Sequence, residues 1–461
     1  MIRKFKTENI VYLFLFFLGF IFWHAFLNIS NPILVANDWI NFNLHLDTMR
    51  LGFKEETIPW FPSTAYGNNK YFLANPELVT TPDILLIKYL SNSLVIYIHI
   101  MILYVIGFYS LLLISKKYDL SVFSFMIFYL LFNYNGYILT HISAGHFTWT
   151  GYYLIPLFIY NFNEFLESRL EKYLIYSSII MGVLYLNGSF HISIFLCLFL
   201  LFCVIWHPGD LFPTIKIIVF GVFIGISKIL PALIFFKHDG RLDMNSKFRF
   251  ITGYPDVGTL LDALLVQRNF SYSLKVVSGE LHWHEYSIYI GLFPFISLSF
   301  GVYYVYKNHL VSLNTSILLG GFFMLLMAFE NTYSVIANAP LPFVGIERIS
   351  TRFIVIPYLI FLISGIIGLD KFLKIQKVKK IFLSILLFFT LGNLYTNLIH
   401  WRISVYNIKN NIDNSGLILL TNREHYYSNI IYLSWTISFL ALFLLLFKLK
   451  KGEFRYKVTF Y

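Results

Sequence analysis

Charged side chains are scarce in this chain of 461 residues. Asp, Glu, Lys and Arg together make up 13% of it, whereas hydrophobic residues make up 57%. Soluble proteins carry about 25% charged residues, so the composition excludes a soluble globular protein. Alternating strands of about ten residues are also lacking, which argues against a membrane β-barrel. Many apolar runs instead reach the roughly 20 residues with which a helix crosses a bilayer, and they predict an all-α polytopic membrane protein.

Cysteine is rare as well, with Cys197 and Cys203 in one apolar run. There they cannot close a loop, and they are interpreted as small core residues. The chain lacks low-complexity tracts and internal repeats, which weakens the hypothesis of a transporter built from repeats. The net charge of +11 is divided among short segments between apolar runs. That distribution indicates membrane topology, and no nucleic-acid partner is expected.

Twelve membrane spans are predicted, at residues 10–29, 94–115, 119–136, 147–164, 173–187, 190–206, 215–236, 286–306, 312–329, 352–369, 381–399 and 429–447. With both termini in the cytoplasm, basic segments such as 370–380 and 448–461 fall on the cytoplasmic side, as the positive-inside rule requires. Two short loops on the opposite side, 137–146 and 188–189, contain no Lys or Arg. The first apolar run is too long for a typical signal peptide and is interpreted as an uncleaved helix.

Residues 1–461 are therefore interpreted as a single integral membrane domain. Its polar residues gather in four long outer loops, at residues 30–93, 237–285, 330–351 and 400–428. We expect these loops to contain structure, including short helices that lie in the membrane interface.

The first outer loop contains an acidic residue close to the membrane. If a helix starts near Asn37, then Asp38, Asn41 and His45 share one face of it. Asp is also a favoured helix cap, so capping and a chemical role are both open for Asp38. Asn37, Asn41, His45 and, further along the loop, Trp60 are candidate substrate-binding residues, because amides match sugar hydroxyls and aromatic faces match C–H faces.

A second cluster precedes the span at 286–306. Glu280, His282, His284 and Glu285 place two imidazoles and two carboxylates within six residues. Such a cluster is suited to a divalent metal or to proton transfer. Hydrogen bonding to a substrate and a purely structural role are the alternatives, and no metal ligand set follows from the spacing.

Two further positions carry candidate functions. Arg348 and Arg352 are four residues apart at the start of a span and are predicted to share a helix face. The guanidinium fork suits phosphate oxygens, and an ion pair with Glu347 is the alternative. His146 follows Gly145 in a turn whose small residues favour close helix packing, and it is also a candidate substrate contact.

Several short motifs together resemble one known family. They are Gly52 to Pro62, in the pattern G-x-x-x-x-x-I-P-W-x-P, followed by Tyr66-Gly67; Gly145-His146-Phe-Thr-Trp149; Tyr289-Ile-Gly291-Leu-Phe-Pro294; and Gly345-x-x-Arg348-x-x-x-Arg352-Phe353. With the Asp after the first span, they resemble the YfhO-like bacterial branch of the GT-C superfamily of membrane glycosyltransferases. The likeness extends over most of the chain.

The resemblance implies a multispanning fold with an outward-facing cavity, a polyprenyl-phosphate sugar donor and an inverting transfer. By position, Asp38 matches the first-loop Asp that acts as a base or binds the acceptor. Many relatives have a paired acidic motif there, whereas this chain has Asn37-Asp38. This departure puts a metal-assisted mechanism in doubt, so no cofactor follows from the resemblance, although a divalent metal stays open.

The function expected from these observations is hexosyl or pentosyl transfer to an acceptor hydroxyl on a glycan, lipid or protein. Asp38 would act as the base, and Arg348 and Arg352 would bind the donor phosphate. The expected place is the outer face of a bacterial inner membrane, in contact with its lipids. A transporter or lipid flippase and a non-catalytic scaffold of an envelope assembly are the alternatives. Asp38, residues 280–285 and Arg348 around one cavity would favour the enzyme.

Overall fold

The computed structural model describes residues 2–29, 38–58, 72–235, 252–268, 273–276, 279–310, 313–337, 347–375, 379–402 and 425–450. Within these ranges the chain is helical, apart from one antiparallel hairpin and two isolated bridges. The hairpin pairs β1 (Ser273–Val276) with β2 (Gly279–His282). This architecture agrees with the predicted α-helical class.

The α-helices are α1 (Ile2–Leu27), α2 (Trp39–Lys54), α3 (Asn92–Lys117), α4 (Val122–Asn133), α5 (Gly136–Ala144), α6 (Ile155–Ser168), α7 (Glu171–Leu186), α8 (Phe190–Trp206), α9 (Leu211–Ile224), α10 (Ile226–Phe235), α11 (Val257–Leu265), α12 (Leu292–Lys307), α13 (Thr315–Met327), α14 (Glu330–Ala337), α15 (Val355–Ile375), α16 (Lys379–Trp401) and α17 (His425–Lys450). Short 3₁₀ helices join them: η2 (Phe72–Ala74), η3 (Pro82–Lys88), η4 (Phe147–Leu154), η5 (Pro208–Asp210), η6 (Trp283–Glu285) and η7 (Ser350–Ile354).

Five stretches of the described chain are long and apolar enough to cross a membrane: Glu8–Leu27, Asn92–Lys117, Val122–Ala144, Ser350–Lys374 and Ser428–Lys450. A sixth arises if η5 and α9 form one span with α10, across a bend of 77°. Each of the twelve predicted segments contains helix, but several of these helices are short. The chain is thus an α-helical membrane protein, and the count of twelve spans stays a prediction.

The prediction of an outer loop at residues 137–146 is wrong, because α5 occupies most of these residues. The helix resumes after Asn135, whose side-chain oxygen accepts a hydrogen bond from the Ile138 N–H at 3.3 Å. Within stretch Val122–Ala144, 83% of the 18-residue apolar window is buried in the protein, and the polar residues Asn133, Asn135, Thr140 and His141 are buried as well. The polarity that indicated a loop belongs to a buried helix instead.

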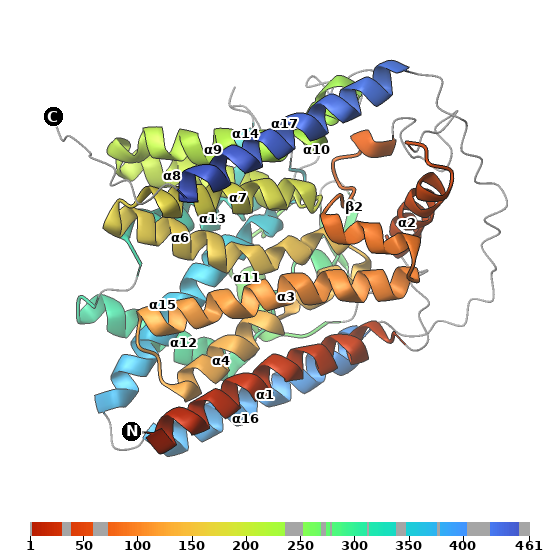
Figure 1. The fold of residues 1–461 in the computed structure, drawn as a ribbon. Coiled ribbons are helices and arrows are strands. Elements are labelled where there is room, and N and C mark those ends of the chain that lie inside the picture. Colours follow the sequence, from red (N-terminus) through yellow and green to blue (C-terminus); the bar gives the residue numbers. More distant parts are fainter. Residues whose placement is uncertain are drawn as a thin grey trace.

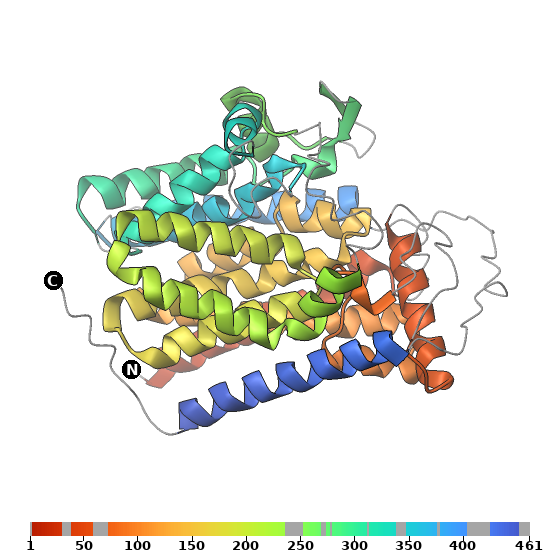
Figure 2. The same cartoon turned by 90° about the horizontal axis from the view of Figure 1, so that it is seen from above.

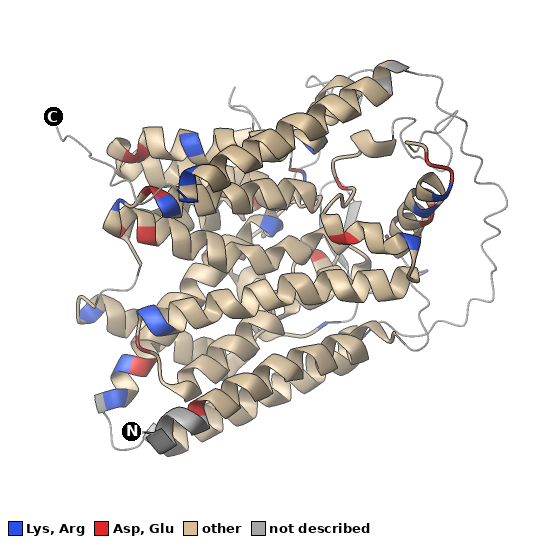
Figure 3. Cartoon of the chain, viewed as in Figure 1, with Lys and Arg blue, Asp and Glu red and all other residues tan. Residues whose placement is uncertain are grey.

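The long helices lie side by side, and the polar elements gather at one end of them (Figures 1 and 2). Helix α2 and the hairpin lie at this end, whereas α1 begins and α17 ends at the opposite end. Lys, Arg, Asp and Glu are sparse along the middle of the long helices and more frequent near their ends (Figure 3). Charged residues therefore lie at both ends of the helices, with few between them.

Small residues allow a close contact between helices α12 and α15. A Cβ added at Gly301 would collide with the backbone of Gly365, and one added at Gly368 would collide with the backbone of Gly301. Such contacts are typical of membrane helices, where packing and not water exclusion holds helices together. This contact holds α15, which follows η7, against α12.

Candidate functional site

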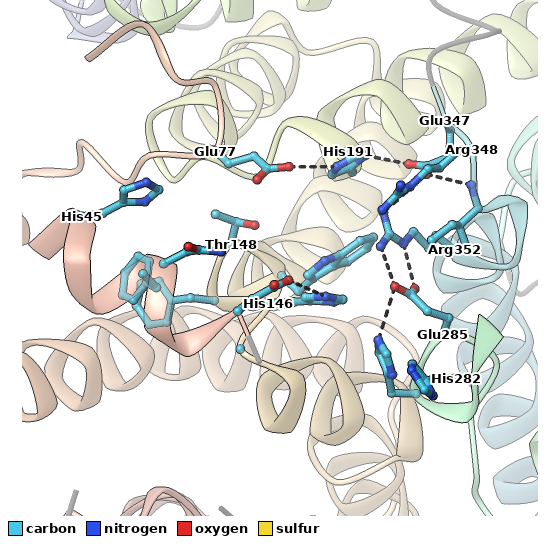
Figure 4. Close-up of a pocket in the computed structure, with 18 residues that line it drawn as sticks. His45, Glu77, His146, Thr148, His191, His282, Glu285, Glu347, Arg348 and Arg352 are labelled. Carbon is cyan, nitrogen blue, oxygen red and sulfur yellow. Dashed lines mark hydrogen bonds and ion pairs between the residues drawn. The ribbon is translucent and has the colours of Figure 1, made fainter. Parts of the chain in front are cut away.

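A cavity of about 720 Å³ lies at the end of the bundle that carries α2 (Figure 4). Cavities of about 300–1,000 Å³ are typical of small-molecule sites. Its lining combines polar, charged and aromatic side chains from segments far apart in the sequence: Asp38, Asn41, Phe42, His45, Glu77, Gly145, His146, Phe147, Thr148, Trp149, His191, His282, His284, Glu285, Glu347, Arg348, Ile349 and Arg352.

The structure brings nine of the predicted site residues to this lining: Asp38, Asn41, His45, His146, His282, His284, Glu285, Arg348 and Arg352. Asn37 and Trp60 lie outside the described residues. Glu280 belongs to β2, but its side chain is not among those described. The shared helix face predicted for Asp38, Asn41 and His45 is turned toward the cavity.

Asp38 occupies the N-cap position of α2, but its side chain does not cap the helix. Its side chain makes no capping hydrogen bond, and its carboxylate lies 3.1 Å from Nε2 of His146 instead. The Asp38 side chain is 59% exposed, whereas that of His146 is 13% exposed. The predicted cap is therefore confirmed in position but not in its side-chain hydrogen bond, and Asp38 presents an accessible carboxylate that is oriented by an imidazole.

The turn after α5 explains how these two residues meet. Gly145 ends α5 in the left-handed conformation, with φ of 92°, and its N–H donates to the carbonyl of His141. A Cβ at Gly145 would collide with the backbone of Trp39. The Asp38 N–H also donates to the Ala144 carbonyl at 3.2 Å. Because only glycine adopts this conformation without strain, Gly145 lets the start of α2 dock on the end of α5.

His146 is hydrogen-bonded on both of its nitrogens. Its Nδ1 lies 2.8 Å from Nδ1 of His141, a buried residue of α5 whose ring stacks on Trp149 at 4.5 Å. The Asp38 carboxylate can only accept, so Nε2 of His146 donates to it. In a neutral His146, Nδ1 then accepts from the Nδ1–H of His141. His141 was not among the predicted site residues, because a buried polar residue on a helix carries no signal of its partners.

Arg352 occupies the inner wall and holds two buried carboxylates. Its Nε and Nη2 donate to Glu285 at 2.9 and 2.6 Å, and its Nη1 donates to Glu347 at 3.4 Å. Its guanidinium lies 5.2 Å from the ring centre of Trp149. The Arg352, Glu285 and Glu347 residues are 7%, 6% and 3% exposed. The ion pair that was the alternative for Glu347 is therefore realised.

The prediction that Arg348 and Arg352 share a helix face is wrong. Arg348 precedes η7 in an extended segment, where the Thr252 N–H donates to its carbonyl at 2.9 Å and the Ser350 N–H donates to the Thr252 carbonyl at 2.6 Å. The Arg348 side chain is exposed, and within the described ranges no carboxylate pairs with it. Of Arg348 and Arg352, only Arg348 thus has a guanidinium available to an anionic ligand.

His191 connects two carboxylates that come from distant segments. Its Nε2 lies 3.4 Å from Glu77, its Nδ1 lies 2.6 Å from Glu347, and its ring stacks on Trp149 (Figure 4). The hydrogen bond from His191 lowers the pKa of Glu77 to about 2. Burial alone would raise the pKa of Glu347, but the neighbouring His191 and Arg352 outweigh burial and lower it. Glu77 was not predicted, because nothing in Asn-Pro-Glu distinguishes it from an ordinary turn.

The predicted His- and Glu-rich cluster is divided by the structure. His282 ends β2 and is exposed at the cavity, whereas His284 and Glu285 are buried in η6. Nε2 of His284 lies 3.5 Å from Glu285, and burial lowers the pKa of His284. The hydroxyls of Thr140 and Thr351 donate to the carbonyls of His284 and Glu285 at 3.0 and 2.6 Å and fix this backbone.

One group of potential metal ligands occurs among the described residues, and it differs from the predicted cluster. It consists of His141, His146 and Glu285, whose ligand atoms all lie within 4.8 Å of one another. His282 and His284 do not belong to it. The cluster that seemed suited to metal in the sequence therefore contributes only Glu285.

Comparisons with family models, curated proteins and solved structures found no match to this chain. The fold and the cavity define its class without them. It is an α-helical membrane protein with a polar, charge-lined cavity at one end of its helices.

Proposed function

We propose that this protein is a membrane glycosyltransferase that moves a sugar from a polyprenyl-phosphate donor to an acceptor hydroxyl. The observation that carries the proposal is the state of Asp38, an exposed carboxylate oriented by His146 at the cavity wall. Glu285 and Glu347 are bound by Arg352 and buried, so they are poorly placed to accept a proton from a ligand. Asp38 is available for that task.

The cavity offers separate groups for the two parts of the donor. Exposed Arg348 supplies a guanidinium that suits phosphate oxygens. Asn41, His45 and Thr148 line the same cavity and supply donors and acceptors for sugar hydroxyls. Trp149 also lines the cavity, but it is poorly suited to stack on a sugar, because the rings of His141 and His191 stack on it.

A second cavity, of about 450 Å³, supports a lipid as the carrier of the sugar. Its lining is mostly apolar and comes from α2, η3, α10 and α17, with Phe53, Ile84 and Phe439 among its residues. The segment between η2 and η3 separates the two cavities, because its Glu77 lines the first and its Thr80 lines the second. A prenyl chain in the second cavity would place its phosphate beside the first.

The proposed reaction is a single displacement at the anomeric carbon. The acceptor oxygen forms a bond to that carbon while Asp38 takes its proton, and the bond from the carbon to the phosphate oxygen breaks. The polyprenyl phosphate leaves with the electron pair, and Arg348 stabilises its charge. His146 keeps the Asp38 carboxylate in place. General-base catalysis of this kind contributes about 10²–10⁴-fold to the rate.

The test uses purified protein in liposomes with a panel of polyprenyl-phosphate hexoses and pentoses. Asp38→Asn keeps the shape of the side chain but removes its basicity, so it should lower the transfer rate by about 10²–10⁴-fold. Asp119→Asn is the matched control, because Asp119 is 90% exposed, pairs with Lys374 and does not line the cavity. Transfer by Asp38→Asn at the wild-type rate would contradict the assignment of the base.

A further inference from the structure

Three potential metal ligands converge on the inner wall of the cavity. Nδ1 of His141 and Nδ1 of His146 lie 2.8 Å apart, and one ligand atom each of His141, His146 and Glu285 lie within 4.8 Å of one another. His141 and Glu285 are buried, and of the three residues His146 and Glu285 line the cavity. We propose that these three residues bind a divalent transition-metal ion whose remaining coordination position faces the cavity.

Asp38 prepares His146 for this role. Because the Asp38 carboxylate accepts from Nε2 of His146, the Nδ1 lone pair of a neutral His146 is directed toward His141. A carboxylate on the second nitrogen is the usual arrangement of a metal-binding imidazole, since it fixes the ring and increases its basicity. Asp38 would therefore orient a metal ligand as well as meet the acceptor.

Glu285 retains capacity for a metal beside Arg352. An ionised carboxylate has about four lone-pair positions. One oxygen of Glu285 lies near both Arg352 and His284, and the other accepts only from Nε of Arg352 among the described contacts. The second oxygen thus has a free position, and Arg352 holds the carboxylate in one orientation.

The charge of the lining favours a cation. Four carboxylates, Asp38, Glu77, Glu285 and Glu347, face two guanidiniums, those of Arg348 and Arg352. The lining is therefore negative even when His191 carries a proton. An anionic phosphate would enter such a cavity at an electrostatic cost, which a bound divalent cation would offset. This use of the metal, to offset the charge of a donor phosphate, adds to the proposed function and rests on it.

The ligand set selects the metal. Two imidazoles and one carboxylate are the ligands of catalytic zinc sites, which keep a fourth position for water or substrate, whereas Mg²⁺ prefers oxygen ligands. Two imidazole nitrogens about 2.05 Å from a tetrahedral Zn²⁺ are about 3.4 Å apart. The two Nδ1 atoms would therefore separate by about half an ångström when the metal replaces the hydrogen bond between them.

The binding test needs no sugar donor. Wild-type protein without a histidine tag is stripped with a chelator and titrated with ZnCl₂ and with MgCl₂ by calorimetry. It should bind one Zn²⁺ per chain with a dissociation constant below about 1 μM, and Mg²⁺ far more weakly. X-ray absorption at the zinc edge should show two imidazole ligands. His146→Gln should abolish this binding, and Asp38→Asn should weaken it by about 10–100-fold.

His282→Gln is the matched control, because His282 lines the same cavity but lies outside the ligand group. Absence of stoichiometric Zn²⁺ binding by folded wild-type protein would overturn the site. So would wild-type affinity in both His146→Gln and Asp38→Asn, or an equal loss in His282→Gln. Zinc binding without any sugar transfer would contradict the proposed function but not the metal site, whereas transfer without zinc binding would do the reverse.

Discussion

Arg348 and Arg352 allow a sharp test of the roles assigned to them, because the same substitution should impair a different property at each position. Arg352 is buried and makes two short hydrogen bonds to Glu285 and a longer one to Glu347. Arg348 is exposed in the cavity and has no carboxylate partner among the described residues. Arg352→Gln should therefore lower stability, and Arg348→Gln should lower donor binding.

The magnitude for Arg352 follows from its contacts. Each hydrogen bond to a charged group contributes about 1.5–3 kcal/mol, so the two short bonds to Glu285 account for about 3–6 kcal/mol. Removing one partner of a buried ion pair costs about 3–5 kcal/mol, because the other charge stays buried without its counterion. We expect Arg352→Gln to lower the free energy of unfolding by about 3–5 kcal/mol. Arg348→Gln should change it by less than about 0.5 kcal/mol.

The assay is equilibrium unfolding of the purified proteins in mixed micelles, followed by circular dichroism. Binding of a polyprenyl-phosphate sugar is measured in parallel and should weaken by about tenfold or more in Arg348→Gln, equivalent to about 1.4 kcal/mol. Adding Glu285→Gln to Arg352→Gln should restore part of the stability, because it removes the unpaired charge. Equal stability of Arg348→Gln and Arg352→Gln would refute this reasoning.

Two further predictions concern the geometry and the charges of the cavity. Gly145→Ala should destabilise the protein by at least about 1–2 kcal/mol, because alanine is strained in the left-handed conformation and its Cβ would collide with the backbone of Trp39. Equilibrium unfolding checks this prediction, and an unchanged unfolding midpoint would contradict it. Acid should destabilise the protein as pH falls from about 4.5 toward 2, since the pKa of Glu77 is lowered from 4.5 to about 2 and that of Glu347 is also lowered. The stability that these carboxylates contribute is present above their unfolded pKa and is lost on protonation. The stability of Glu77→Gln should therefore depend less on pH in this window than that of wild type. An identical pH dependence of stability in the two proteins would count against the role of Glu77.

Local patterns in the sequence determined the class of the fold. Apolar runs of membrane length predict helices because a helix satisfies its backbone within its own segment, and no distant partner is required. The shared face of Asp38, Asn41 and His45 is local in the same way, since it follows from the helical repeat. These three residues do line one cavity, although α2 begins at Trp39 and not at Asn37.

Such local patterns could not predict the contacts between segments that are distant in the sequence. The resemblance pointed to Asp38, Arg348 and Arg352, but neither spacing nor composition indicated that Arg352 is paired with Glu285 and Glu347 while Arg348 stays exposed. The loop predicted at 137–146 failed for the same reason, since its polar residues are buried against other helices.

Only the tertiary structure decided which polar residues form the site. It joined Glu77 to His191, and Asp38 through His146 to His141, by packing against one another segments that lie far apart in the sequence. A polar side chain has the same appearance in the sequence whether it is hydrated, paired or aimed at a ligand. Its state depends on which charges and dipoles packing brings within a few ångströms, and the order of residues along the chain does not specify this locally.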